Sequence, residues 1–206
     1  MGKNANMAVL GYAAFALTLW LASMGPAGWF EPSGGGLVTL LVVQPGNVLL
    51  PLAVIVLGGC VLAVAGIGQY LGGRGLDASL FLAFAGYWWI AALGQRALDA
   101  VAYGTTPGFL GWYYALWALV AFCLWLAAWK ADMARMLFAA GLCLMLVASA
   151  LASWIRFGAL EVLGGYIGLV AAVLGIYIFA AEIINDLHDG NVLPLGETGN
   201  RATPSA

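Results

Sequence analysis

Charged side chains are scarce in this chain of 206 residues. Asp, Glu, Lys and Arg make up only 8% of it, whereas a soluble domain of ordinary composition carries about 25%. The seven Lys and Arg residues are spread over the whole length, so no basic patch for nucleic acid can form. The low charge therefore predicts a membrane protein with no nucleic-acid partner.

Residues that carry chemistry are scarce as well. His188 is the single histidine, which excludes a histidine cluster for metal binding or acid–base catalysis. Cys60, Cys123 and Cys143 all fall within apolar stretches, and their spacing suits neither a zinc site nor a disulfide framework; we interpret them as packing residues. The sequence thus predicts no enzyme, with no catalytic residues, no metal and no cofactor.

Long apolar stretches are what the sequence has in abundance. There are six, at residues 7–24, 48–71, 78–93, 109–129, 133–154 and 159–181. Most have the length that a helix needs to cross roughly 30 Å of hydrocarbon. Lipid cannot hydrogen-bond to the backbone, and these stretches lack the alternating pattern of a barrel. We predict an all-α integral membrane protein, a bundle of six transmembrane helices that forms one domain over residues 1–206.

The first connection between spans is long. Residues 25–47 contain three prolines and a triple glycine, which are turn and breaker signals. Within them, the apolar segment 37–43 would measure only about 10 Å as a helix, too short to cross, so we expect it to be re-entrant or to lie on the surface. At the other end of the chain, residues 186–206 are expected to form a polar tail.

The distribution of Lys and Arg predicts the orientation. With six spans, five of the seven cations share the side of the termini, and these are Lys3, Arg74, Lys130, Arg135 and Arg201. Only Arg96 and Arg156 lie on the other side. Because cytoplasmic loops carry the excess of Lys and Arg, we expect a multi-pass protein of the inner (plasma) membrane with both termini in the cytoplasm.

Ionisable residues within spans mark function when they occur. Here they lie only near span ends: Arg74 and Asp77 are placed to pair at the start of the third span, and Glu182 ends the sixth. None is near the middle of a span, so a proton relay of buried carboxylates is not predicted. A scaffold with apolar walls suits passage of a small solute better than bond chemistry.

Several motifs point to a family. The segment Asn6-Met7-Ala8-Val9-Leu10-Gly11-Tyr12 resembles the signature Asn-Pro-Ala-Pro-Leu-Gly-Leu, without its prolines. The chain also carries Gly58-Gly59 with Trp88, then Gly165-Tyr166-Ile167-Gly168-Leu169, Glu182-Ile183-Ile184-Asn185 and Val192-Leu193-Pro194-Leu195-Gly196-Glu197. Together they resemble the acetate uptake transporter family, the succinate–acetate permeases. The resemblance covers nearly the whole chain but omits residues 31–47, which look like an insertion.

The resemblance implies a protomer of six helices that encloses its own pore, commonly assembled into a ring of six. Such proteins move acetate and related short carboxylic acids, accompanied by protons. The implied partners are therefore the acid, protons, membrane lipids and further copies of the chain, a hexamer. By position in the motifs, the apolar constriction of the pore would be formed by Phe15, Phe84 and Leu142, with Asn6 and Gly175 near the path.

Outside the N-terminal signature, the chain departs from the family pattern at three further positions. Phe84 stands where the family usually has Tyr, and Leu62 and Gln69 stand where it has Gln and Glu. The path is therefore expected to be less polar. Two further functions remain open: a channel for another small neutral solute such as ammonia or glycerol, and a membrane subunit that does not transport. Phe15 and Phe84 also remain open to interpretation as packing aromatics. For an acid, we expect passage in the neutral form.

Overall fold

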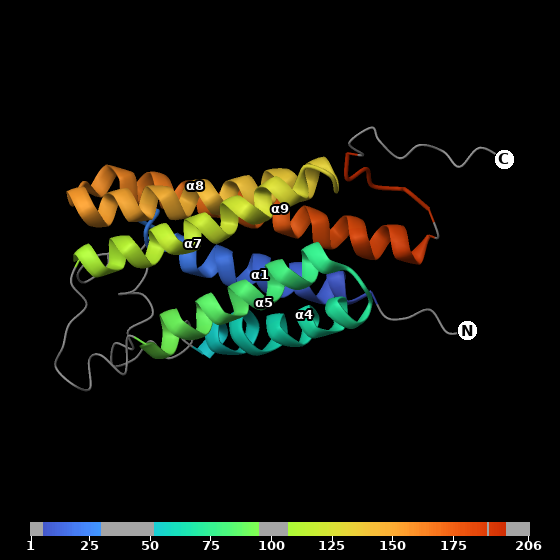
Figure 1. Cartoon of the computed structure of the whole chain (residues 1–206). Helices are drawn as coiled ribbons and strands as arrows, with labels where there is room; N and C mark the ends of the chain where they lie inside the picture. The colour runs from blue at the N-terminus through green and yellow to red at the C-terminus, as the bar shows by residue number, and fades with distance from the viewer. Residues whose placement is uncertain (1–5, 30–51, 95–106, 189, 197–206) are drawn as a thin grey trace.

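Six helices long and apolar enough to cross a membrane make up the described part of the protein in a computed structural model (Figure 1). The structure describes residues 6–29, 52–94, 107–188 and 190–196. The helices are α1 (Met7–Met24), the π-helical η1 (Val54–Val61) continued by α4 (Leu62–Leu71), α5 (Gly75–Trp89) continued by the π-helical η2 (Ile90–Gly94), α7 (Pro107–Ala128), α8 (Met133–Ile155) and α9 (Gly158–Leu187). The predicted fold class is confirmed, while the segment 37–43 lies outside the described residues.

The helices contact one another in a closed order. From α5 the contacts pass to α4 and η1, then to α1, α9, α8 and α7, and from α7 back to α5. In Figure 1, α7, α8 and α9 accordingly lie together on one side of α1, α4 and α5. Alternate members of this order, namely α1, α5 and α8, supply all but one of the largest fully buried side chains, and the exception is Leu62 of α4. The interior of the bundle is therefore filled mainly from three of its six helices.

Glycines allow the closest contacts between helices. A Cβ atom at Gly165 of α9 would lie 2.3 Å from the backbone nitrogen of Ala27, and one at Gly168 would lie 2.2 Å from Ser23 Oγ. A Cβ at Gly59 would lie 2.0 Å from the indole nitrogen of Trp89. Small residues in membrane helices allow close packing of this kind. Here the contacts lie within one protomer, so these glycines do not by themselves argue for an oligomer.

The start of α1 and the end of α9 lie at the same end of the bundle. The Asn6 side chain donates a hydrogen bond of 2.7 Å to Glu182, and we call this end the Asn6 end. α9 continues to Leu187, beyond the predicted boundary at residue 181. The polar residues there stay helical because the helix remains packed against its neighbours, with Glu182 bound to Asn6 and to Arg135.

The chain beyond α9 turns back onto the bundle. The backbone N–H groups of Met133 and Ala134 donate to the carbonyl groups of Gly196 and Leu195, at 2.7 and 3.0 Å. The Asn185 side chain accepts from the N–H groups of Val192 and Leu193 at 2.8 Å each. The described part of the predicted polar tail is therefore docked against the start of α8.

Candidate functional site

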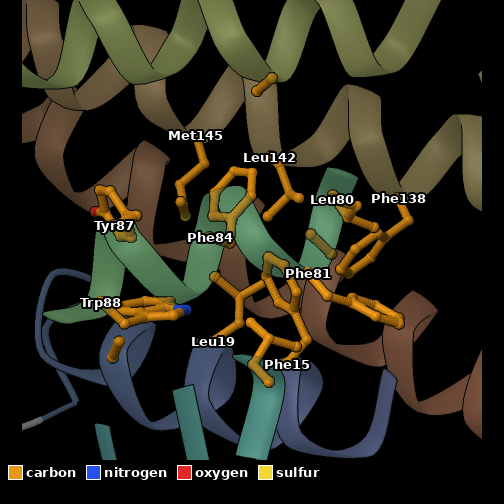
Figure 2. Close-up of a cluster of buried hydrophobic side chains, with 14 of the residues drawn as sticks. Phe15, Leu19, Leu80, Phe81, Phe84, Tyr87, Trp88, Phe138, Leu142 and Met145 are labelled. Atoms are coloured by element: carbon orange, nitrogen blue, oxygen red, sulfur yellow. The ribbon is translucent and has the colours of Figure 1, made fainter. Parts of the chain in front are cut away.

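A cluster of aromatic rings closes the axis of the bundle. The ring of Phe15 on α1 lies 5.0 Å from that of Phe84 on α5 and 5.1 Å from that of Phe138 on α8, measured between centroids. These three side chains and Leu142 are fully buried (Figure 2). We call these four residues the constriction. The structure thus brings together Phe15, Phe84 and Leu142, which sequence matching had proposed.

Phe138 is the member that sequence reasoning missed. It precedes Leu142 by four residues on α8, so both side chains lie on the same face of that helix. That spacing was the available signal. Gly175, also proposed from the sequence, contributes by its lack of a side chain: a Cβ there would lie 3.0 Å from Phe138 Cε2 and from Ala16 Cβ. Gly175 therefore makes room for the Phe138 ring beside α1.

Asn6 lies away from the constriction, at the end of the bundle where α1 begins. It is the N-cap of α1, and its Oδ1 accepts from the N–H of Ala8 at 3.2 Å. The same oxygen accepts from Arg74 at 2.9 Å. Sequence spacing had suggested that Arg74 would pair with Asp77, but the structure places Arg74 at Asn6. Asp77 instead contacts Arg135, which belongs to α8, on the other side of the interior from α5.

The positions that depart from the family pattern are buried. Leu62 is fully buried, and Gln69 is 3% exposed with no hydrogen-bond partner for its Nε2 among the described residues. The ring of Phe84 contacts Tyr87 at 5.7 Å and Trp117 at 6.0 Å between centroids. Phe84 adds no hydroxyl to the constriction, whereas the hydroxyl of the neighbouring Tyr87 is buried without a hydrogen-bond partner among the described residues.

Tyr12 connects the constriction to a group of charges. Its ring meets those of Phe138 at 5.7 Å and Phe81 at 5.1 Å, edge to face. Its hydroxyl donates a buried hydrogen bond of 2.8 Å to Asp77 Oδ1. Tyr12 occupies the last position of the N-terminal motif, where the family signature has Leu. The aromatic cluster therefore ends in a polar atom on the side of the Asn6 end.

Arg135 lies at the centre of these charges. Its Nε is 3.1 Å from Asp77 Oδ1, its Nη1 binds Asp132 and its Nη2 binds Glu182. The guanidinium also lies over the ring of Tyr12, 5.4 Å from its centroid. The four charged side chains are only 7–13% exposed. We call Arg135, Asp77, Asp132 and Glu182 the Arg135 cluster.

Four helices meet in the Arg135 cluster and at Tyr12: α1, α5, α8 and α9. Asp132 is also the N-cap of α8, since its Oδ1 accepts from the N–H of Arg135 at 2.8 Å. Three carboxylates face one guanidinium, so the ionised cluster has an excess of negative charge. Buried charges are costly, which makes the cluster a candidate for function.

Sequence reasoning placed Asp77 and Glu182 correctly near span ends, but it did not single out Asp132 and did not predict that the three carboxylates are buried together. Each lies within the first or last turns of a different element, and only the packing order of the helices brings them to one point. The one available signal was Tyr12, a hydroxyl in a signature position that is normally apolar. The sequence predicted no group of buried carboxylates, whereas the structure buries three, all of them on one side of the constriction.

The arrangement combines the buried apolar side chains of the constriction with a guanidinium whose three nitrogen atoms bind carboxylates of the protein. The constriction has no hydrogen-bonding group and would favour small neutral solutes. The guanidinium of Arg135 can bind carboxylate oxygens in a planar, charge-assisted geometry. Together they fit a path for a small acid.

Comparison with known proteins agrees with this description. A sequence model of the GPR1/FUN34/yaaH family matches residues 2–192. The succinate-acetate/proton symporter SatP of Escherichia coli (strain K12) is 24% identical over 198 residues, covering 95% of this chain and 97% of that protein. The symporter of the same name from Shigella flexneri matches equally. A solved structure described as that of the bacterial acetate channel SatP superposes with a TM-score of 0.80 at 22% identity, covering 94% of this chain and 100% of that chain.

Proposed function

The chain belongs to the GPR1/FUN34/yaaH family, and on this premise we propose that it transports acetate and related short carboxylic acids across a cell membrane. Its relatives named as succinate-acetate/proton symporters are matched over nearly their full length. The observation that supports the proposal most is the constriction: an apolar barrier on the axis of a bundle whose fold is that of an acetate channel.

The constriction favours passage of the neutral acid. A charge at the centre of a membrane helix costs at least about 2.5–3.5 kcal/mol on insertion scales. Phe15, Phe84, Phe138 and Leu142 offer no charge and no hydrogen bond to offset that cost. A short carboxylic acid that carries its proton avoids it. The proton then crosses with the acid, and no protein group has to carry it through the constriction.

Uptake by liposomes containing the purified protein tests the proposal. Labelled acetate, propionate, lactate and succinate are compared with ammonia and glycerol, and the rate of protein-free liposomes is subtracted from each. We expect protein-dependent uptake of the acids. Uptake of ammonia or glycerol alone would indicate a channel for another neutral solute, and no uptake of any solute would indicate a subunit that does not transport.

We also propose that the Asn6 end faces the cytoplasm. Arg74, Lys130 and Arg135 adjoin this end, whereas Arg156 follows the opposite end of α8. Lys and Arg favour the cytoplasmic side, although the charge of Arg135 is taken up by its carboxylates. The test is a reporter enzyme that is active only outside the cytoplasm, fused after Ala206. Activity of that reporter would contradict this orientation.

A further inference from the structure

We propose that Arg135 is the carboxylate-binding residue of the path, and that a transported acid takes the place of Glu182 on its guanidinium. The inference rests on the proposed function. It concerns what happens once an acid has passed the constriction and reached the Asn6 end.

Position is the first argument. The ring of Phe138 belongs to the constriction and contacts the ring of Tyr12 at 5.7 Å, and Tyr12 contacts the guanidinium at 5.4 Å. The ring of Tyr12 lies between Phe138 and Arg135. A solute that leaves the constriction toward the Asn6 end therefore reaches Arg135 next. The guanidinium is the only positive charge of the cluster and is 13% exposed.

The geometry of the guanidinium is the second argument. Its three nitrogen atoms each bind a different carboxylate, Asp77, Asp132 or Glu182. A guanidinium has five N–H groups in a planar fork that matches the two oxygens of one carboxylate. A single carboxylate of the solute can therefore replace a single carboxylate of the protein without loss of hydrogen bonds.

Glu182 is the partner most suited to exchange. Asp132 is held as the N-cap of α8, and Asp77 is held by the hydroxyl of Tyr12. Glu182 has the longer side chain, and its second bond comes from the Asn6 amide, which can also donate to the carbonyl oxygen of a protonated carboxyl group. Glu182 can thus leave the guanidinium while the other two carboxylates stay.

The exchange balances in protons and charge. The O–H bond of the neutral acid breaks, and its proton bonds to the carboxylate of Glu182. The resulting anion binds Arg135 Nη2 in place of Glu182. The donor and the acceptor of the proton are both carboxyl groups, so the bond that breaks and the bond that forms are of the same kind. The total charge of the site is unchanged, because the incoming anion is offset by the neutralised Glu182; an anion added without this proton transfer would join three carboxylates around one guanidinium.

The kinetics of acetate uptake by proteoliposomes test the assignment. Arg135→Gln combined with Glu182→Gln removes one charge of each sign, so the net charge of the cluster is kept and two amides can pair. We expect the KM for acetate to rise about tenfold or more, the effect of losing a hydrogen bond to a charged group. Arg135→Lys keeps the positive charge among the three carboxylates but loses the planar fork, and its KM should also rise.

Arg74→Gln is the matched control, because Arg74 lies in the same corner but contacts Asn6 rather than the cluster; its KM should stay unchanged. If Arg135 only holds the helices together, the variants lose thermal stability and active protein while KM is unchanged, and that result would overturn the inference. Absence of acetate uptake by the unaltered protein would instead refute the proposed function itself.

Discussion

Phe84 is the side chain on which the width of the proposed path most directly depends. Its ring packs against that of Phe15, with 5.0 Å between the centroids, and it also contacts the rings of Tyr87 and Trp117. We expect Phe84→Ala to open the constriction, so that propionate and longer acids are taken up faster relative to acetate. The measurement is the ratio of initial uptake rates for acids of increasing length.

Phe81→Ala provides the control for that prediction. It removes the same ring from the same helix, but Phe81 fills the space at Gly11 between α5 and α1. Both variants should lose stability, typically 3–5 kcal/mol for a buried Phe→Ala change, and only Phe84→Ala should change the ratio. An unaltered ratio in Phe84→Ala would remove this residue from the gate.

A charge at the same position should have the opposite effect on transport. Phe84→Asp places a carboxylate among fully buried rings, where it is poorly solvated and would retain a neutral acid by accepting a hydrogen bond from its O–H group. We expect acetate uptake to fall to the level of protein-free liposomes at neutral pH. Equal amounts of folded protein, verified by gel filtration in detergent, make the comparison valid. Uptake equal to that of the unaltered protein would show that solute does not pass this point.

Helix α9 depends on glycine where it crosses the end of α1. A Cβ at Gly165 would lie 2.3 Å from the backbone nitrogen of Ala27, and backbone cannot move aside as a flexible side chain can. We therefore expect Gly165→Ala to lower the free energy of unfolding by about 1–3 kcal/mol, the usual cost of overpacking. Gly158→Ala on the same helix meets no atom within 4 Å and should change little. Thermal unfolding followed by tryptophan fluorescence compares the two; equal melting temperatures would contradict the close contact.

The segment after α9 is held at two places. Asn185 accepts from the N–H groups of Val192 and Leu193 and donates to the carbonyl of Leu193 at 2.9 Å, while the carbonyls of Leu195 and Gly196 accept from the start of α8. We expect Asn185→Ala to release Val192 and Leu193 and to speed their amide hydrogen exchange. Leu187→Ala, a change at an exposed residue two positions on, should leave that exchange slow. Slow exchange in both variants would mean that other contacts hold the segment.

The sequence predicted the helices better than their contacts. Apolar length placed α1 and α8 almost to the residue, because lipid requires a continuous helix wherever backbone is exposed to it. The end of α9 was placed too early, because Glu182 interrupts the apolar stretch and its contact with Arg135, from a distant part of the chain, cannot be read from the sequence. The constriction members Phe15, Phe84 and Leu142 could be proposed by matching motifs, whereas Phe138 and the Arg135 cluster depend on which helices become neighbours.

At the level of the whole protein, the closed order of helices gives each protomer an axis of its own. We therefore expect transport to occur within protomers, and the family resemblance leads us to expect a homo-hexamer. Closed cyclic symmetry is the usual form of such assemblies. Native mass spectrometry in mild detergent should show six copies of the chain. Monomers alone, under all conditions that preserve the fold, would refute the hexamer without affecting the path.

The pH dependence of acetate uptake tests the neutral-acid path most directly. The pKa of a short carboxylic acid is near that of Glu, about 4.3, so lowering the external pH from 7 to 5 raises the neutral fraction roughly 80-fold. Initial rates are measured at a fixed, subsaturating total acetate concentration, and the rate of protein-free liposomes is subtracted because neutral acid also crosses lipid. We predict that the protein-dependent rate rises with the neutral fraction and that protons enter with the acid. A protein-dependent rate that is equal at both pH values, without proton entry, would show that the anion crosses and would contradict the account.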